Sequence, residues 1–200
     1  MGNEAHCRVD VAGRSAEAKV LLETEEIVVR GAIKLRAPFR EIEHAAARDG
    51  VLAFRLRGDD VALHVGAQAA KWLDKIRNPK SAVDKIGVKA GQRVSIIGDI
   101  GELAGDVEAR SGDVSTRLRK GSDIIFFAAT KRSELAKLEN LRQSLAPNGA
   151  LWVIRPKGTE TIGEADVMAA GKAAGLVDVK VVKVSDVLTG EKFVIPVTKR

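Results

Sequence analysis

The hydrophobic periodicity of this chain changes near Pro79, and that change constrains its fold more than any other feature. Within residues 17–65, apolar and polar residues alternate in short segments separated by turns, which predicts an antiparallel sheet. In VLAFRLR at 51–57, apolar residues fall on one face and arginines on the other. The stretch GAQAAKWLDKIRNP at 66–79 has helical spacing instead, so it predicts one amphipathic helix covering the sheet.

After Pro79, strand-like and helix-like segments alternate, which is typical of an α/β layered domain. The predicted fold is therefore an α+β N-terminal part, an antiparallel sheet with a C-terminal helix. A Rossmann-like α/β domain with a shortened, mostly parallel sheet follows it. The predicted organisation is a flexible N-terminus at 1–16, a β domain at 17–78 and the Rossmann-like domain at 79–200.

Composition excludes several classes of protein. The longest apolar run, IIFFAA at 124–129, is far shorter than the roughly 20 residues of a membrane span. The single cysteine, Cys7, cannot form an internal disulfide, and the N-terminal segment lacks the apolar stretch of a secretion signal, so a cytoplasmic protein is expected. The formal charge of +6 arises from intermixed acidic and basic residues, which does not favour a nucleic-acid partner.

The first part resembles a known fold. A run of strands followed by one amphipathic helix is similar to the bacterial pleckstrin-homology-like fold. The stretch PFREIEHAAARDGVLAFRL resembles an entry and hairpin common in such modules. The resemblance covers residues 17–78 and implies a small sheet closed by its C-terminal helix.

The second part, residues 80–198, resembles a class I methyltransferase-like Rossmann fold. VKAGQRVSIIGD is similar to the first strand of that family, SDIIFF to its fourth and LRQSLAPNGALWVI to its fifth. GLVDVKVVKV and KFVIPV are similar to its two closing strands. About 24 residues separate Gly98 from Ser122, fewer than two strand-helix units need, so the predicted sheet is shortened by one unit.

Several stretches also resemble an uncharacterised bacterial family, whose members contain a domain of unknown function. They are KIRNPKSAVDKIGVKAGQRVSIIGD, GALWVIRPKG and ADVMAAGKAAGLVDVKVVKV with the downstream KFVIP. That resemblance spans most of the chain and implies no particular activity.

A ligand crevice is predicted where the strands of the second part end, because open α/β sheets bind ligands outside the carboxyl ends of their strands. Its edges are expected at the six residues Gly98, Asp99, Gly101, Thr130, Arg155 and Lys157. The two basic residues would favour an anion, or would instead face water or pair with acids. The glycine spacing is G-x-x-G-x-x-x-G rather than the dinucleotide-binding G-x-G-x-x-G, so a simple strand-to-helix turn is the competing interpretation.

Other candidate chemistry is sparse. The positions where a dinucleotide fold places a ribose-binding acid hold Arg117, Arg119 and Lys120, which could bind a phosphate or simply solvate a loop. The histidines have no metal-ligand spacing, so no metal site is predicted. The methyltransferase family has an Asp or Asn with prolines and an aromatic after its fourth strand. FAATKRS stands there instead, so no catalytic residue is assigned.

These observations lead to one preferred function and two alternatives. The preferred hypothesis is a non-catalytic binding or assembly module on a degenerate methyltransferase-like fold, whose partner is a small molecule or protein of unknown identity. The first alternative is an enzyme or sensor that binds S-adenosylmethionine or a related nucleotide in the crevice. The second is nucleic-acid binding through Arg117, Arg119 and Lys120. The cofactor is unknown, and open edge strands would allow a homo-oligomer.

Overall fold

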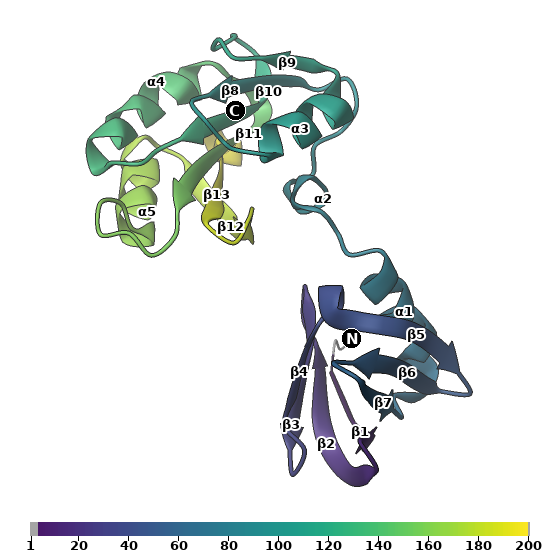
Figure 1. The fold of residues 1–200 in the computed structure, drawn as a ribbon. Helices are drawn as coiled ribbons and strands as arrows, with labels where there is room; N and C mark the ends of the chain where they lie inside the picture. The colour runs from purple at the N-terminus through teal and green to yellow at the C-terminus, as the bar shows by residue number, and fades with distance from the viewer. Residues whose placement is uncertain (1–3, 200) are drawn as a thin grey trace. The chain divides into compact units, whose positions relative to one another are not determined.

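The computed structural model of the protein describes residues 4–199, and the side chains of residues 4–198. The chain divides into two compact units, Met1–Lys80 (unit 1) and Ser81–Arg200 (unit 2). Each unit contains its own sheet and its own hydrophobic core (Figure 1). Within the described residues, no helix combines the length and the apolar character needed to cross a membrane.

Unit 1 is a seven-stranded antiparallel sheet in the order β4-β3-β2-β1-β7-β6-β5, curved into a nearly closed, barrel-like shape. Its strands are β1 (Glu4–Val11), β2 (Arg14–Leu22), β3 (Glu26–Gly31), β4 (Leu35–Pro38), β5 (Ile42–Arg48), β6 (Val51–Leu56) and β7 (Asp59–Leu63). Two short 3₁₀ helices, η1 (Phe39–Glu41) and η2 (Gly66–Gln68), precede β5 and the helix α1 (Ala69–Arg77). This arrangement gives no clear confirmation of a pleckstrin-homology-like fold, which stays a prediction.

The expected flexible N-terminus is corrected by the structure for the residues it describes; residues 1–3 lie outside them. Strand β1 pairs with β2 along its whole length, from Glu4 opposite Leu21 to Val11 opposite Arg14, and also pairs with β7. Cys7 and Val9 of this strand are buried in the core. Because β1 joins the β2–β4 and β5–β7 halves of the sheet, it is an ordered, central strand.

Alternate residues of the strands point into one core in unit 1, and α1 covers that core. Trp72 of α1 is 1% exposed and packs with Phe54 of β6 and other apolar residues of the inner sheet face. The predicted helix is therefore confirmed, and it ends at Asn78, just before Pro79. Burying an indole of this size contributes roughly 3 kcal/mol of hydrophobic stabilisation, so α1 is part of the fold of unit 1.

Unit 2 alternates strands and helices as its sequence pattern predicts. Its strands are β8 (Arg93–Ile97), β9 (Asp113–Ser115), β10 (Ser122–Ala128), β11 (Leu145–Pro156), β12 (Val177–Lys183) and β13 (Leu188–Val194). Its helices are α2 (Ala82–Ile86), α3 (Leu103–Ser111), η3 (Arg132–Lys137), α4 (Leu138–Gln143), α5 (Glu164–Ala173) and η4 (Val197–Lys199). The stretch RSELAKLENLRQSL at 132–145, whose leucines recur at helical spacing, forms a 3₁₀ segment followed by a short α-helix rather than one continuous helix.

The six strands of unit 2 lie in the order β12-β13-β11-β10-β8-β9. Strands β9, β8, β10 and β11 are parallel, whereas β13 is antiparallel to both β11 and β12. The sheet is therefore mixed rather than mostly parallel. Only α3 and the three-residue β9 connect β8 to β10, so the predicted loss of one strand-helix unit is confirmed. The fold of unit 2 is a shortened methyltransferase-like Rossmann fold.

Helices cover both faces of this sheet, with α3 on one side and α4 and α5 on the other (Figure 1). Alternation along the buried strands makes this possible. In β10, Ile125 and Phe127 pack toward α4 and α5, and Ile124 and Phe126 pack toward α2 and α3. A strand that is buried on both faces has a continuous run of apolar residues in its sequence. This explains the run IIFFAA, which lies in and just after β10.

The start of α5 lies later than the capping-box spacing of Thr161 and Glu164 would predict. The N-cap is Gly163, whose backbone N–H donates to the Asp166 carboxylate at 2.7 Å. Thr161 instead donates its hydroxyl to the carbonyl of Thr130 at 3.0 Å. At the other end, Gly175 has a φ of +72°, as expected of a glycine that ends a helix, and its N–H donates to the Lys172 carbonyl.

Candidate functional site

The candidate site lies where the connections of two neighbouring parallel strands diverge. From β8 the chain passes through α3 to β9 on one side, and from β10 it passes through η3 and α4 to β11 on the other. In open α/β sheets, such a reversal of strand order leaves a crevice outside the carboxyl ends of the two strands. The segment after β8, residues 98–102, and the segment after β10, residues 129–131, lie at the two strand ends where such a crevice is expected.

The turn after β8 brings three predicted residues together. Gly98 has a φ of +90° and lies against β10, because a Cβ on it would come within 2.9 Å of the Ala128 Cβ. The Gly101 N–H donates to Asp99 Oδ1 at 2.8 Å, and Gly101 has a φ of +63°. All three residues are exposed. Glycines are needed here for backbone conformation and, at Gly98, for close contact with the neighbouring strand.

Helix α3 begins directly after this turn. Its N-cap, Glu102, makes no side-chain hydrogen bond to the first turn of the helix. The N–H of Ala104 in this first turn donates to the Gly101 carbonyl at 3.1 Å, so the first turn is closed by backbone rather than by a side-chain cap. The N–H groups of a helix N-terminus, together with the helix dipole, favour a negatively charged or strongly polar ligand.

On the β10 side, Thr130 is exposed, but its polar groups are occupied. Its N–H and hydroxyl both donate to Glu134 Oε2, at 2.7 and 3.2 Å, and the Lys131 N–H donates to the same oxygen at 3.0 Å. These backbone donations are the main reason that the pKa of Glu134 is lowered. Thr130 therefore shapes this edge of the crevice through its backbone, and its hydroxyl serves as part of a helix cap.

Arg155 does not provide the expected anion contact. It is buried at 8% exposure, and its guanidinium donates to Glu191 Oε1 through Nε at 2.9 Å and Nη2 at 2.8 Å. Glu191 is fully buried, its Oε2 has no partner, and burial raises the pKa of its carboxyl despite the nearby Arg155. The side-chain charge of Arg155 is thus committed to Glu191 of β13, and only its backbone lies at the strand end.

Lys157 lies beyond the end of β11, half-buried, and its ammonium donates to the Ser185 carbonyl at 2.6 Å. The Lys157 N–H also donates to the Val187 carbonyl at 2.9 Å. Lys157 therefore holds the turn between β12 and β13 against the end of β11. Sequence reasoning did not anticipate that this turn would reach the crevice.

The residue that brings this turn to the crevice is Leu188. Its Cδ1 lies 3.6 Å from the position that a Cβ on Gly101 would occupy. Leu188 and Gly101 are far apart in sequence, and no motif in either segment signals the contact. The antiparallel pairing of β13 with β11 sets it, because Leu188 faces Pro156 at the carboxyl end of β11.

The basic run offers less to a nucleic acid than its sequence suggests, because Arg119 is used in the fold. Its guanidinium donates to the Asp113 carboxylate at 2.6 Å and to the carbonyls of Val94 and Asp113 at 3.0 and 2.9 Å. Its backbone N–H donates to Ser95 Oγ, which also contacts Ser122 Oγ at 2.8 Å. Arg119 thus joins the loop after β9 to strand β8, and the expected three-residue basic cluster is not available.

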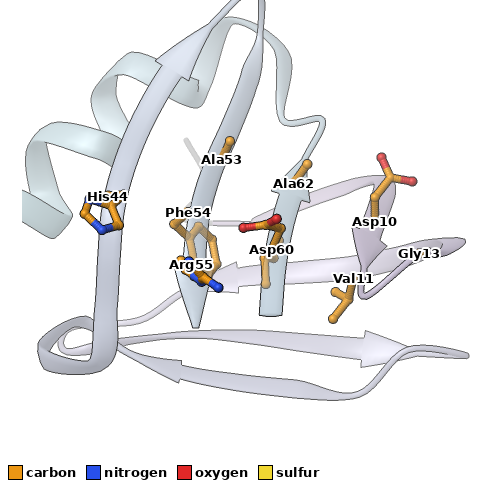
Figure 2. Close-up of a pocket in the computed structure, with 10 residues that line it drawn as sticks. Asp10, Val11, Gly13, His44, Ala53, Phe54, Arg55, Asp60 and Ala62 are labelled. Atoms are coloured by element: carbon orange, nitrogen blue, oxygen red, sulfur yellow. The ribbon is translucent and has the colours of Figure 1, made fainter. Parts of the chain in front are cut away.

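Unit 1 has a separate hollow of about 460 Å³ on its sheet, at β1, β5, β6 and β7 (Figure 2). Two of its ionisable lining side chains, Asp10 and Arg55, have partners. Asp10 Oδ2 lies 2.7 Å from His64 Nε2, and Arg8 donates to the same carboxylate. Hydrogen bonds from Ser15, His64 and Arg8 hold the pKa of Asp10 far below its usual range. Arg55 Nε donates to the Gly58 carbonyl at 3.2 Å. Among residues 4–199, no three His, Cys, Asp or Glu side chains gather as a metal site would require.

No family model matches this chain, and no curated protein matches it either. Three similar solved structures show the level of likeness. A SAM-dependent methyltransferase from Aquifex aeolicus is 19% identical with a TM-score of 0.42, over 56% of this chain and 86% of that one. A TehB-like SAM-dependent methyltransferase from Corynebacterium glutamicum is 11% identical with a TM-score of 0.38, over 64% and 95%. The fibrillarin pre-rRNA processing protein from Methanococcus jannaschii is 8% identical with a TM-score of 0.42, over 90% and 98%.

The preferred hypothesis from the sequence, a non-catalytic binding or assembly module on a degenerate fold, is corrected by the methyltransferases among the similar structures. Two of them are named as SAM-dependent methyltransferases, and a third is a magnesium protoporphyrin IX methyltransferase with bound SAM. The alternative of an S-adenosylmethionine-binding or nucleotide-binding enzyme or sensor agrees better with this finding. At such low identities the likeness concerns the fold alone.

Proposed function

We propose that unit 2 binds S-adenosylmethionine or a related nucleotide in the crevice between the carboxyl ends of β8 and β10, as an enzyme or a sensor. One observation supports this above all others: the strand order reverses between β8 and β10, and the glycine turn 98–101 stands at that reversal. Ligands of α/β sheets bind at such a position.

The residues of the crevice fit the polar part of such a ligand. Gly98 and Gly101 present backbone without side chains, and the first turn of α3 has no side-chain cap. The exposed carboxylate of Asp99 could accept a hydrogen bond from an amine or a ribose hydroxyl, in addition to the one from Gly101. Strand β9 ends at Ser115 without a carboxylate, so the ribose-binding acid of a dinucleotide fold has no counterpart there.

S-adenosylmethionine would supply an electrophilic methyl group when bound. The chain's own contribution would be to orient the ligand and shield it from water. The turn 98–101 and the backbone at Thr130 would position the ligand, and Leu188 would shield it on the side of the β12–β13 turn. FAATKRS supplies no carboxylate or amide directly after β10, so no base is assigned to this strand end.

Calorimetric titration of Gly101→Val tests the proposal. A valine side chain at Gly101 would project beside Leu188 into the crevice and block the approach of a ligand to the turn. Wild-type protein is expected to bind S-adenosylmethionine, S-adenosylhomocysteine or another nucleotide of a panel, and the variant is expected to lose that binding. Absence of binding by wild-type protein to every compound would refute the proposal.

Gly112→Val is the matched control. Gly112 ends the same helix, has a similar φ of +74°, and its Cβ would meet nothing within 4 Å. Both valines impose backbone strain of about 1–3 kcal/mol, so the two variants should lose similar thermal stability. Only Gly101→Val should lose binding; equal losses of affinity in both variants would point to general destabilisation.

Three finer interpretations from the sequence are also proposals. We propose that unit 1 is a pleckstrin-homology-like module, supported by seven antiparallel strands with one C-terminal helix on the sheet. Membership of the bacterial family with a domain of unknown function is supported by the shared sequence stretches alone. A cytoplasmic location is supported by the single cysteine, which is buried and free.

A further inference from the structure

A row of donor side chains lies on the face of the unit 2 sheet that carries α2 and α3. Trp152 of β11 is paired in register with Lys192 of β13, and Lys192 with Lys180 of β12. These residues share a face, because Trp152 belongs to the core under α2 and α3. The Lys180 ammonium lies 5.8 Å from the centroid of the Trp152 ring. The row runs across β11, β13 and the edge strand β12, and it lies away from the carboxyl ends of β8 and β10 that border the crevice.

The three side chains of this row supply donors but no acceptor. In the part of the chain that the structure describes, the side-chain ammonium of Lys192 makes no hydrogen bond or ion pair, although the residue is half-buried. The Lys180 ammonium donates to a neutral group, the carbonyl of Lys85 at the end of α2. The indole Nε1 of Trp152 is buried without a partner. Lys180 is exposed, whereas Trp152 is buried and Lys192 half-buried. Buried or half-buried donors normally have acceptors, so Trp152 and Lys192 are unusual within the fold.

No nearby carboxylate of the sheet or of α2 offsets the two positive charges. Glu191 lies on the opposite face, where it pairs with Arg155, and Asp178 is in register with Phe193 on that same opposite face. Asp84 of α2 is bound by Ser81 and Arg110. Burial, and to a smaller degree the charge of Lys180, lowers the pKa of Lys192. The two lysines of the row therefore lack a negatively charged partner.

We propose that Lys180 and Lys192 together bind an oxyanion, a phosphate or carboxylate group, beside the Trp152 side chain. Each ammonium can give a charge-assisted hydrogen bond to one oxygen of such a group, and the bound charge would relieve the repulsion between the two lysines. The site is independent of the proposed crevice, since it lies on the sheet face and uses none of the crevice residues.

Nuclear magnetic resonance of the indole N–H groups tests this proposal on the full chain. The protein has two tryptophans, so two indole resonances are expected, and Trp72 in the core of unit 1 serves as an internal reference. Inorganic phosphate, phenyl phosphate and acetate would be titrated against sodium chloride at matched ionic strength. The Trp152 resonance should move and saturate with at least one of the three, and the Trp72 resonance should not move. Comparing phosphate and acetate then identifies the preferred oxyanion.

Lys192→Met is expected to weaken the binding that this titration reports by about tenfold or more. A methionine keeps the length and apolar stem of the side chain, so the fold should persist and the indole resonances should confirm it. Lys183→Met is the control, because Lys183 lies on the same strand as Lys180 but pairs with Asp186 at 2.9 Å. Lack of a saturable shift in wild-type protein, or an unchanged affinity in Lys192→Met, would overturn the proposal.

Discussion

At the scale of single residues, the pair formed by Arg155 and Glu191 is the most consequential charged contact of unit 2. Both side chains are removed from water, which costs several kcal/mol for each ion, and two hydrogen bonds to one carboxylate oxygen offset part of that cost. The second carboxylate oxygen has no partner. The pair therefore adds little net stability. Removing one partner would leave the other as an unpaired buried charge, whose desolvation penalty nothing offsets.

We expect Glu191→Leu to lower the free energy of unfolding by about 3–5 kcal/mol, because it leaves the buried guanidinium of Arg155 without its acidic partner. Arg155→Met should cost less under acidic conditions, since Glu191 can become neutral by taking up a proton. The pKa of Glu191 is raised in the folded state, so the folded protein binds a proton at a higher pH than the unfolded chain does. The free energy of unfolding of Arg155→Met should therefore rise as the pH falls from the raised pKa of the folded state to the usual pKa of the unfolded chain.

The double variant Arg155→Met/Glu191→Leu should lie within about 1 kcal/mol of wild type, since two apolar side chains replace the pair. Urea denaturation of the wild type, both single variants and the double variant measures the cycle. A double variant as unstable as Glu191→Leu would show that lost packing, rather than the orphaned charge, causes the loss.

At the scale of elements, two helix glycines in unit 2 have opposite surroundings. A Cβ on Gly171 of α5 would lie 2.3 Å from the ring of Phe193, so this glycine lets α5 approach β13 closely. A Cβ on Gly105 of α3 would meet nothing within 4 Å. The first glycine is required by packing, and the second only lowers the helix propensity of α3.

Gly171→Ala should therefore destabilise the protein by about 1–3 kcal/mol, because Phe193 or the helix must shift to make room for a methyl group. Gly105→Ala should stabilise it by about 0.5–1 kcal/mol, since alanine is the better helix former and nothing obstructs it. Thermal unfolding of both variants under identical conditions measures the two effects. Effects of the same sign would contradict the proposed close approach of α5 to β13.

At the scale of the whole molecule, the chain consists of two units with separate cores. The core of unit 1 draws on its seven-stranded sheet and α1, and the two cores of unit 2 draw on the six-stranded sheet and its helices. The boundary falls between Lys80 and Ser81, where Ser81 begins α2 by accepting a hydrogen bond from the Asp84 N–H. No buried strand or helix crosses this boundary.

Residues 81–200 are accordingly expected to fold when produced alone, as are residues 1–80. Circular dichroism and amide-proton dispersion of each fragment measure this, and the sum of the two fragment spectra should reproduce that of the whole chain. Fragment 81–200 should also keep the ligand binding proposed for the crevice and the anion binding of Lys180 and Lys192. A disordered fragment would show that one unit depends on contacts with the other.

Much of this architecture follows from the sequence. Alternation along β6, helical spacing around Trp72 and the apolar run of β10 identify their elements, because side-chain period is a direct consequence of strand and helix geometry. The short distance from Gly98 to Ser122 correctly indicates a missing strand-helix unit. Strand β1 has the same alternation, with Cys7 and Val9 between polar or charged neighbours, so its sequence pattern also indicates a strand. Its central place in the sheet follows only from its pairing with β2 and β7.

The candidate site divides in the same way. A strand, a glycine turn and a helix in succession are local features, so the sequence by itself determined the turn at Gly98–Gly101 and its place at the end of β8. The partners of long side chains are not local. That Arg155 meets Glu191, that Leu188 reaches Gly101, and that Lys192 lies between Trp152 and Lys180 were decided by the antiparallel register of β11, β13 and β12. Register depends on how the whole sheet packs, because a shift of one residue would turn every side chain of a strand to the other face.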